Sequence, residues 1–291
     1  MPDIFPLELI PEIMESPENF RLQRRVPEFW AGETFSESRG ESQSEAFVAF
    51  MDLETTGLDK ARDKVIQIAI ITAYCDRQTG NILRISDHCT MFEDPGAPLP
   101  ENIKSLTGIS DSDLKGQSFD AGKIERILNG QPLVLAHNAS FDRPFFDRRF
   151  PKCKALKWGC TLKDPDWQKA GFRSHALEQL LSSSGYFYTG HNAMTDVGAT
   201  VWLMHLHPGQ MLELLNKAES GIAVIDAIGS PFQQKDALRL RGYRWNAGNR
   251  YWSREISVDQ IDREKTFLNG LYKNGGARAR ITPQDASERF R

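Results

Sequence analysis

The apolar run AFVAFMDLE at residues 46–54 constrains the fold more than any other part of this sequence. Its β-prone composition predicts a buried strand. Two carboxylates interrupt the run, Asp52 and Glu54, and they stand two residues apart. Because side chains alternate between the two faces of a strand, both carboxylates are expected on the same face. The sequence therefore predicts a buried strand that carries two like charges side by side.

Further strands and helices are predicted after this run. Two strand-like segments at 64–75 and 82–92, joined by the turn DRQTGN, complete a three-strand meander. A helical region from Glu101 to Leu128 is interrupted near Gly108 and Gly116. A buried strand at 132–138 leads into a helix at 140–150, and later helices are expected at 175–185 and 192–207. Strands followed by helices predict an α/β sandwich around one central sheet.

The chain divides into a larger unit, at 46–207, and several appended parts. Residues 1–45 are expected to form an N-terminal extension with short helices around Leu9–Met14 and Phe20–Arg25. Its end, from Ala31 to Glu45, is rich in Ser, Glu and Gly and is interpreted as a linker, because it has little apolar surface to bury. Residues 208–220 are expected to be a connecting helix or linker.

A small α+β module is predicted at 221–274. The pattern indicates a strand at 222–228, a helix at 233–242, a hairpin at 243–256 that turns at 247–249, and a helix at 258–272. The closing residues 275–291 have little to pack and are expected to be a disordered basic tail.

Composition favours a protein of the cytoplasm with no membrane partner. No window approaches the roughly 18 uninterrupted apolar residues of a membrane span. The four cysteines lack the paired spacing of a zinc site, so reduced thiols are expected. The net charge of −3 conceals an asymmetry, since the segment from Lys235 onward has 13 Lys and Arg against 7 Asp and Glu. Such a basic end indicates either a polyanion-binding region or a solvated charged face.

The two carboxylates of the first strand acquire a chemical meaning from three residues further along the chain. Asp52 and Glu54 would repel each other unless a cation lay between them, and hard cations such as Mg²⁺ take oxygen ligands. A D-x-E pair alone is weak support for a metal site. Asp142 follows a buried strand in HNASFDRPFF, and His191 and Asp196 lie in GHNAMTD. Asp196 is expected in the first turns of a helix, with His191 on the loop before it.

Residues 47–206 resemble the exonuclease domain of the DnaQ-like (DEDDh) family, of the RNase T or exonuclease X type. The family motifs appear in order as D-x-E-T-T-G at 52–57, H-N-x-x-F-D at 137–142 and H-x-x-x-x-D at 191–196. A related subgroup has Tyr four residues before its final Asp, but position 192 is Asn. The resemblance is therefore to the histidine subgroup.

The resemblance implies an RNase H-like mixed sheet flanked by helices and a 3′→5′ exonuclease that uses two Mg²⁺ ions, with Mn²⁺ able to substitute. Asp52, Glu54 and Asp196 would hold one ion, Asp52 would bridge to the second, and Asp142 would support that second ion. His191 would take the proton from the attacking water, since its ordinary pKa of about 6.5 suits a base at neutral pH. The products would be nucleoside 5′-monophosphates.

The resemblance also implies substrate contacts and partners. Near the 3′-terminal sugar and base it places the residues that follow Glu54, namely Thr55, Thr56, Gly57 and Leu58. The nucleic-acid partner is expected to be DNA, single strands favoured, while RNA stays open because discrimination depends on how the pocket treats the 2′-hydroxyl. A catalytically idle scaffold that binds nucleic acid or a protein partner is the alternative from another class. Family members of the RNase T type act as dimers, so a homodimer is a further expectation.

Some residues have a structural and a functional interpretation. His137 and Asn138 match the family but could equally satisfy local backbone groups. Phe141 lies in an apolar helix face and is expected chiefly in the core, with a base-stacking role as the alternative. His175 is expected to cap or pack a helix. In the C-terminal hairpin, cationic and aromatic side chains alternate. Two interpretations have equal weight, a nucleic-acid binding surface and the core of the hairpin. The residues concerned are Arg241, Arg244, Trp245, Arg250 and Trp252.

Overall fold

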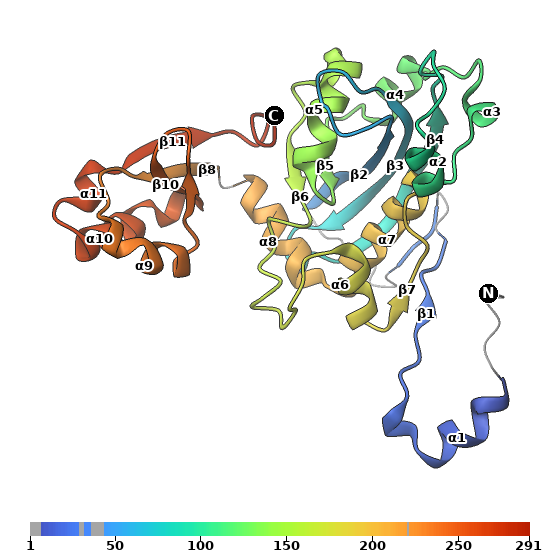
Figure 1. Ribbon diagram of the computed structural model, residues 1–291, viewed down its shortest axis with the longest axis horizontal. Helices are drawn as coiled ribbons and strands as arrows, with labels where there is room; N and C mark the ends of the chain where they lie inside the picture. Colours follow the sequence, from blue (N-terminus) through green and yellow to red (C-terminus); the bar gives the residue numbers. More distant parts are fainter. Residues whose placement is uncertain (1–6, 29–31, 36–43, 220) are drawn as a thin grey trace.

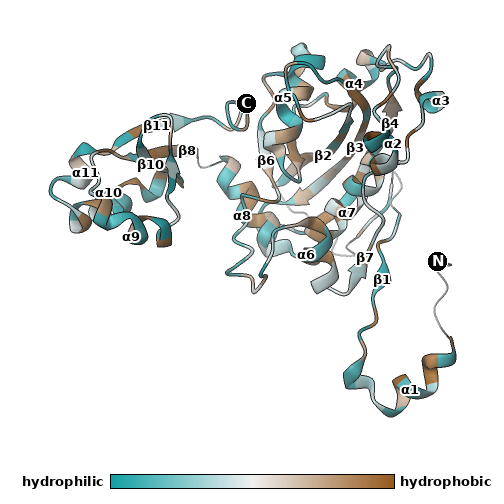
Figure 2. Cartoon of the chain, viewed as in Figure 1, coloured by the Kyte–Doolittle hydropathy of each residue, from teal (hydrophilic) through white to brown (hydrophobic). Residues whose placement is uncertain are grey.

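The structure is a computed structural model that describes residues 7–28, 32–35, 44–219 and 221–291. Its larger unit is a five-stranded mixed sheet with helices on both faces, and a four-stranded sheet forms a separate C-terminal module (Figure 1). Hydrophobic residues gather on the central strands and on the helices that cover them (Figure 2). The predicted α/β architecture with a small α+β module is confirmed.

The central sheet has the strand order β4-β3-β2-β5-β6, with β2 in its middle. The expected meander is present, because β3 pairs antiparallel with both β2 and β4, whereas β5 runs parallel to β2. The parallel edge strand β6 was not predicted from the sequence. The strands are β2 (Glu45–Thr55), β3 (Val65–Asp76), β4 (Ile82–Phe92), β5 (Leu133–Ala136) and β6 (Trp158–Cys160).

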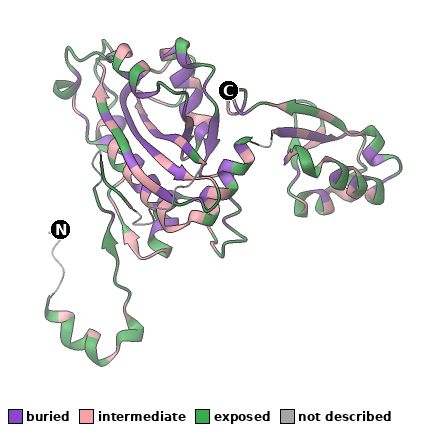
Figure 3. Ribbon diagram, turned by 180° about the vertical axis from the view of Figure 1, so that it is seen from behind, coloured by how far each residue is buried: buried purple, intermediate pink, exposed green. Residues whose placement is uncertain are grey.

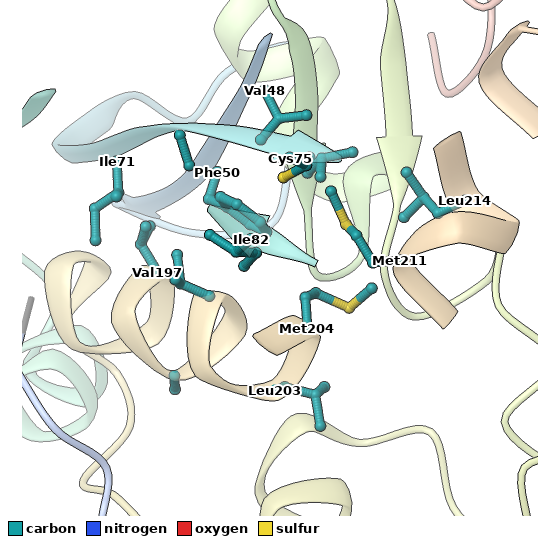
Figure 4. Packing of buried hydrophobic residues seen from close by; sticks show 14 of the residues in the cluster. Val48, Phe50, Ile71, Cys75, Ile82, Val197, Leu203, Met204, Met211 and Leu214 are labelled. Carbon is teal, nitrogen blue, oxygen red and sulfur yellow. The ribbon is translucent and has the colours of Figure 1, made fainter. Parts of the chain in front are cut away.

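Helices cover both faces of this sheet, so that β2, β3, β5 and β6 are mostly buried, whereas the edge strand β4 is partly exposed (Figure 3). The even-numbered residues Val48 and Phe50 of β2 pack against α7 and α8, whereas Ala49 and Met51 pack against α5 on the other face. Figure 4 shows Val197, Met204 and Met211 turned toward the strands. The helices are α2 (Glu101–Thr107), α3 (Asp111–Leu114), α4 (Ala121–Ile127), α5 (Ala139–Arg149), α6 (Leu177–Ser183), α7 (Ala193–Leu206) and α8 (Pro208–Glu219).

Two predicted features between and after these helices have different outcomes. The helical region at 101–128 is interrupted where Gly108 and Gly116 adopt positive φ angles of 71° and 73°, as expected. Residue 220 of the expected connecting segment lies outside the described residues, and residues 208–219 form α8, which is more than a linker. Its Leu214 is fully buried, and it approaches β6 so closely that a Cβ on Gly159 would lie 3.0 Å from the Leu214 Cδ2 atom.

The N-terminal extension differs from the prediction at two places. A helix α1 (Ile10–Glu15) is present, but the helix expected at Phe20–Arg25 is not. Instead β1 (Arg24–Arg25) pairs parallel with β7 (Tyr186–Phe187), because backbone hydrogen bonds to residues far along the chain stabilise an extended form. Residues 31 and 36–43 of the expected linker lie outside the described residues, while Phe35 within it packs on the core.

The C-terminal module has the strand order β11-β8-β10-β9, all antiparallel. The predicted first strand, both helices and the hairpin are confirmed. Its elements are β8 (Ile222–Ala227), α9 (Lys235–Leu240), β9 (Arg244–Asn246), β10 (Tyr251–Ser257), α10 (Ile261–Leu271), α11 (Gly275–Arg278) and β11 (Arg280–Gln284).

The expectation of a disordered tail at 275–291 was wrong. Residues 280–284 form β11 against β8, and the chain then returns to the larger unit, beside which its end lies (Figure 1). There the Trp158 backbone N–H donates to the Ala286 carbonyl at 3.0 Å, and Arg289 is only 1% exposed. The sequence misled because this segment is held by backbone pairing and buried charges, which apolar content does not register.

Candidate active site

Strand β2 and helix α7 bring three carboxylates together. Asp52 and Glu54 continue the face of β2 that carries Val48 and Phe50, and this face is covered by α7. Asp196 lies in the first turn of α7. One carboxylate oxygen of each of these three residues lies within 4.8 Å of the others. The strand alternation predicted from the sequence therefore has the expected result, and the spacing is suited to a shared cation.

Asp142 approaches the same place from the other face of the sheet. It lies in the first turn of α5, is 2% exposed, and accepts a hydrogen bond from the backbone N–H of Leu53, between the two β2 carboxylates. Its Oδ1 atom is buried and has no hydrogen-bond partner among the described residues. A buried carboxylate oxygen without a partner is costly, and a bound metal ion would remove that cost.

The electrostatics of the four carboxyls favour the binding of a cation. Burial and mutual repulsion raise the pKa of Glu54 to about 7 and that of Asp142 to about 8, and they raise the pKa of Asp52 well above its usual range. The pKa of Asp196 is also raised by burial. No lysine or arginine of the described chain is among the groups that shift these values. Oxygen-only, anionic donor sets of this kind suit hard divalent ions.

His191 is exposed and lies on the loop directly before α7, as the sequence predicted. It adopts a positive φ of 67°, and the following residue, Asn192, caps the helix by accepting from the Met194 and Thr195 backbone N–H groups. The His191 backbone N–H donates to the Asp196 carboxylate and helps to lower its pKa, so this loop residue lies beside the carboxylate. The loop thus presents a proton-accepting ring at the edge of the carboxylate cluster.

Two positioning residues were missed by sequence reasoning. The Tyr188 hydroxyl donates to Asp196 Oδ1 at 3.1 Å, while the Asn192 N–H donates to Asp196 Oδ2 at 3.0 Å. Gln67, on β3 opposite Glu54, accepts from the Ala193 N–H at 3.2 Å and so ties the start of α7 to the sheet. Tyr188 lies outside the helix that carries Asp196, and Gln67 is 126 residues from Ala193, so no local pattern could have indicated either contact.

The loop after Glu54 forms one wall beside the cluster. Thr55 Oγ1 donates to the Gly57 carbonyl at 2.6 Å, and Thr56 Oγ1 donates to Asp63 Oδ1 at 2.9 Å. Gly57 must lack a side chain, because a Cβ there would lie 2.6 Å from the Asp63 carboxylate. Leu58 is 80% exposed and free to contact a ligand.

The residues of the second motif are placed mainly by local structure. His137 bonds through Nδ1 to Thr161 Oγ1 and donates through Nε2 to the His175 carbonyl, each at 3.0 Å, and burial lowers its pKa to about 4. A neutral His137 therefore ties the end of β5 to two loops. Asn138 is exposed, with φ 87°, and Phe141 is half-buried with its ring 5.1 Å from that of Phe145. His175 lies before α6, so its carbonyl rather than a helix-capping side chain makes the contact.

The five accessory residues of the module separate into two groups. Arg241 bonds to the buried Glu264, with 3.1 Å between Nη2 and Oε2, and Trp252 packs on the module core. Arg244, Trp245 and Arg250 are exposed. Within the described part of the chain, no helix is long and apolar enough to cross a membrane.

Comparison with known proteins places this site in a family. A family model described as an exonuclease matches residues 49–204, more than half of the chain. DNA polymerase III of the PolC type is 39% identical in Halalkalibacterium halodurans, over 36% of this chain and 7% of that protein. The Bacillus subtilis counterpart is 30% identical over 69% of this chain. This chain spans only 14% of the length of the latter.

A solved structure shares the fold. Escherichia coli exonuclease I, in complex with a dT13 oligonucleotide, aligns with 84% of this chain and 64% of its own, with a TM-score of 0.50 and 16% identity. The fold and the family match agree with the motifs and with the acidic cluster. The chain belongs to the exonuclease family, and the DnaQ-like motifs lie within the residues that its model matches.

Proposed function

We propose that this protein removes nucleotides from the 3′ end of DNA, preferring single strands, and releases nucleoside 5′-monophosphates. The single observation that carries the proposal is the convergence of four carboxylates from β2, α5 and α7, with no lysine or arginine of the described residues among the groups that shift their pKa values. The relatives of the PolC type are DNA polymerases by name, which supports DNA as the polymer.

Each residue has a proposed role. Asp52, Glu54 and Asp196 would hold one Mg²⁺, and Asp52 and Asp142 would hold a second. Two such ions supply charge stabilisation for both the attacking and the leaving oxygen of the phosphodiester. His191 accepts a proton from the attacking water. Tyr188 and the Asn192 N–H fix the orientation of the Asp196 carboxylate.

The loop from Thr55 to Leu58 is proposed to place the 3′-terminal nucleotide. Its backbone is held by the Thr56–Asp63 hydrogen bond, and the exposed Leu58 side chain offers an apolar contact to the last base. Asn138 and Phe141 lie at the start of α5, beside Asp142, and are proposed to contact the strand further from its end. Homodimerisation and a cytoplasmic location stay predictions of the sequence.

The experiment uses 5′-labelled DNA and RNA, single- and double-stranded, with Mg²⁺, Mn²⁺ or a chelator. We expect a ladder that shortens from the 3′ end of single-stranded DNA only when metal is present. Asp142→Asn should abolish the ladder, because it removes a metal ligand. A ladder seen with RNA alone would show that the substrate is RNA and not DNA. Retained binding without cleavage of any substrate would favour the scaffold alternative.

The proton-accepting role of His191 has its own test. His191→Ala should lower the single-turnover rate by about 10²- to 10⁴-fold, the usual contribution of a general base, while leaving metal binding intact. His175→Ala is the matched control, because this second exposed histidine bonds only through its backbone carbonyl. Near-normal activity of His191→Ala would show that another group takes the proton.

A further inference from the structure

The β9–β10 hairpin of the C-terminal module exposes an aromatic side chain that the module core does not use. Trp245 is 51% exposed. It lies opposite Trp252 in the hairpin, with ring centroids 5.7 Å apart and ring planes tilted by 60°. Trp252 packs on the core, whereas Trp245 stands outside it. An indole left half in water offers a flat surface on which a nucleobase can stack.

The hairpin is also strongly cationic. Residues 242–254 contain three arginines and no carboxylate. Arg254 is engaged by the buried Glu264, with 3.1 Å between Nη1 and Oε2. Arg244 and Arg250 are exposed, and within the described residues neither guanidinium has a hydrogen-bond or ion-pair partner. Free guanidinium groups beside an exposed aromatic ring are the combination that binds a single-stranded polyanion.

The position of the hairpin leaves it accessible to a polymer. Strand β9 is the edge of its sheet, so nothing pairs with it on the outer side. Arg239 of α9 lies over the ring of Trp252, 6.0 Å from its centroid, and adds a further cation next to the two tryptophans. The module itself is fastened to the exonuclease unit by the returning C-terminal residues, through the Trp158–Ala286 hydrogen bond and the Arg289–Asp164 ion pair.

We propose that the β9–β10 hairpin is a second nucleic-acid binding site for single strands, in which Trp245 stacks on a base while Arg244 and Arg250 contact phosphates. The proposal rests on the proposed function in one respect: the bound strand is the polymer whose 3′ end occupies the active site. The hairpin would bind the same strand at a distance from the cleaved end, and so would add affinity without taking part in chemistry.

Binding is measured with the full chain in chelator, so that no cleavage occurs, by fluorescence anisotropy of a 5′-labelled oligo-dT. Trp245→Ala should raise the Kd for an oligonucleotide of about 30 nucleotides by about 5- to 150-fold, the loss expected for one stacked base. Trp245→Phe should recover much of this loss, because a phenyl ring still stacks. The exposed position of Trp245 predicts that all these variants fold, which circular dichroism checks.

The arginines are tested by the salt dependence of binding. Removing two phosphate contacts with the double variant Arg244→Ala/Arg250→Ala should reduce the slope of log K against log salt by about 1.4 for a single strand. The matched control removes two positive charges elsewhere on the module, with Arg263→Ala/Lys273→Ala, both exposed and in or just after α10. We expect the control to retain nearly the wild-type slope.

The outcomes separate this proposal from the proposed function. Wild-type Kd values and salt slopes in all hairpin variants would overturn the second site and would instead indicate a surface for a protein partner. A wild-type protein that binds through the hairpin but fails to cleave even a trinucleotide in Mg²⁺ would overturn the proposed function alone. If both hold, the hairpin variants cleave the trinucleotide at the wild-type rate but lose activity on long strands at low concentration.

Discussion

Helix α5 separates two buried charge clusters that are built in opposite ways. On one side Asp142 joins Asp52, Glu54 and Asp196 in a group of four carboxyls. The very next residue, Arg143, is fully buried in a second cluster formed with the C-terminal residues. The first cluster has no lysine or arginine among the groups that act on it in the described chain, whereas the second contains ion pairs between charges of both signs.

The second cluster pairs buried charges with opposite charges and backbone groups, although Asp147 Oδ1 and Arg289 Nε have no hydrogen-bond partner among the described residues. Asp164 accepts from Arg289 Nη1 at 3.0 Å and from the Cys160 N–H at 2.8 Å, with Lys217 Nζ at 3.4 Å. Arg143 donates to the carbonyl groups of Ala286, Ser287, Arg289 and Lys154, and lies 3.4 Å from Asp147. These contacts offset the free-energy cost of desolvating the charges. They also hold the C-terminal segment against α5 and β6.

The difference between the clusters teaches how to separate function from architecture. Buried charges that meet opposite charges and backbone groups fix the fold. Buried charges of one sign destabilise the fold by themselves, so they are retained only where a ligand supplies the missing charge. By this criterion the carboxylate cluster is the functional one, and the Arg143–Asp164–Arg289 cluster is structural.

The largest effect is expected in the structural cluster. Arg289→Ala should lower the free energy of unfolding by about 3–5 kcal/mol, because it leaves Asp164 buried without its main partner. Urea denaturation measures this value. The matched control is Arg126→Ala in α4, whose exposed pair with Asp120 should contribute at most about 1 kcal/mol. Equal effects of the two variants would contradict the distinction between the clusters.

A smaller effect is expected from adding metal. Mg²⁺ at about 100 times its Kd should stabilise the wild-type protein by about 2.7 kcal/mol, because the ion binds only the folded carboxylate cluster. Thermal unfolding with and without Mg²⁺ gives the measurement. The Asp52→Asn variant, which changes the carboxylate at the centre of the cluster, should lose this gain. A metal-dependent shift of the same size in that variant would mean that the ion binds elsewhere.

The same substitution is expected to have opposite signs in the two clusters. In the absence of metal at pH 8, Asp142→Asn should raise the free energy of unfolding, since burial and neighbouring carboxylates disfavour its negative charge. Asp164→Asn, the same substitution in the other cluster, should lower stability, because Arg289 then loses its ion-pair partner. Destabilisation by both substitutions would remove the contrast drawn between the clusters.

The sequence predicted most of the larger unit because its signals are local. Alternation in β2 places Asp52 and Glu54 on one face, and the loop position of His191 follows from the start of α7 at Ala193. The glycines at 108 and 116 mark helix interruptions through their own backbone conformations. Each of these signals needs only neighbouring residues, which is why a pattern in the chain was sufficient.

Only the tertiary structure decided how the four carboxyls, Tyr188 and the C-terminal segment meet. Residues 20–25 were expected to be helical and residues 275–291 to have little to pack, yet β1, β11 and Arg289 are held by hydrogen bonds and ion pairs with distant residues. Arg143 and Arg289 are 146 residues apart, and no periodicity links them. Local sequence determines which elements form and which side chains they present, whereas contacts between distant segments depend on packing of the whole chain.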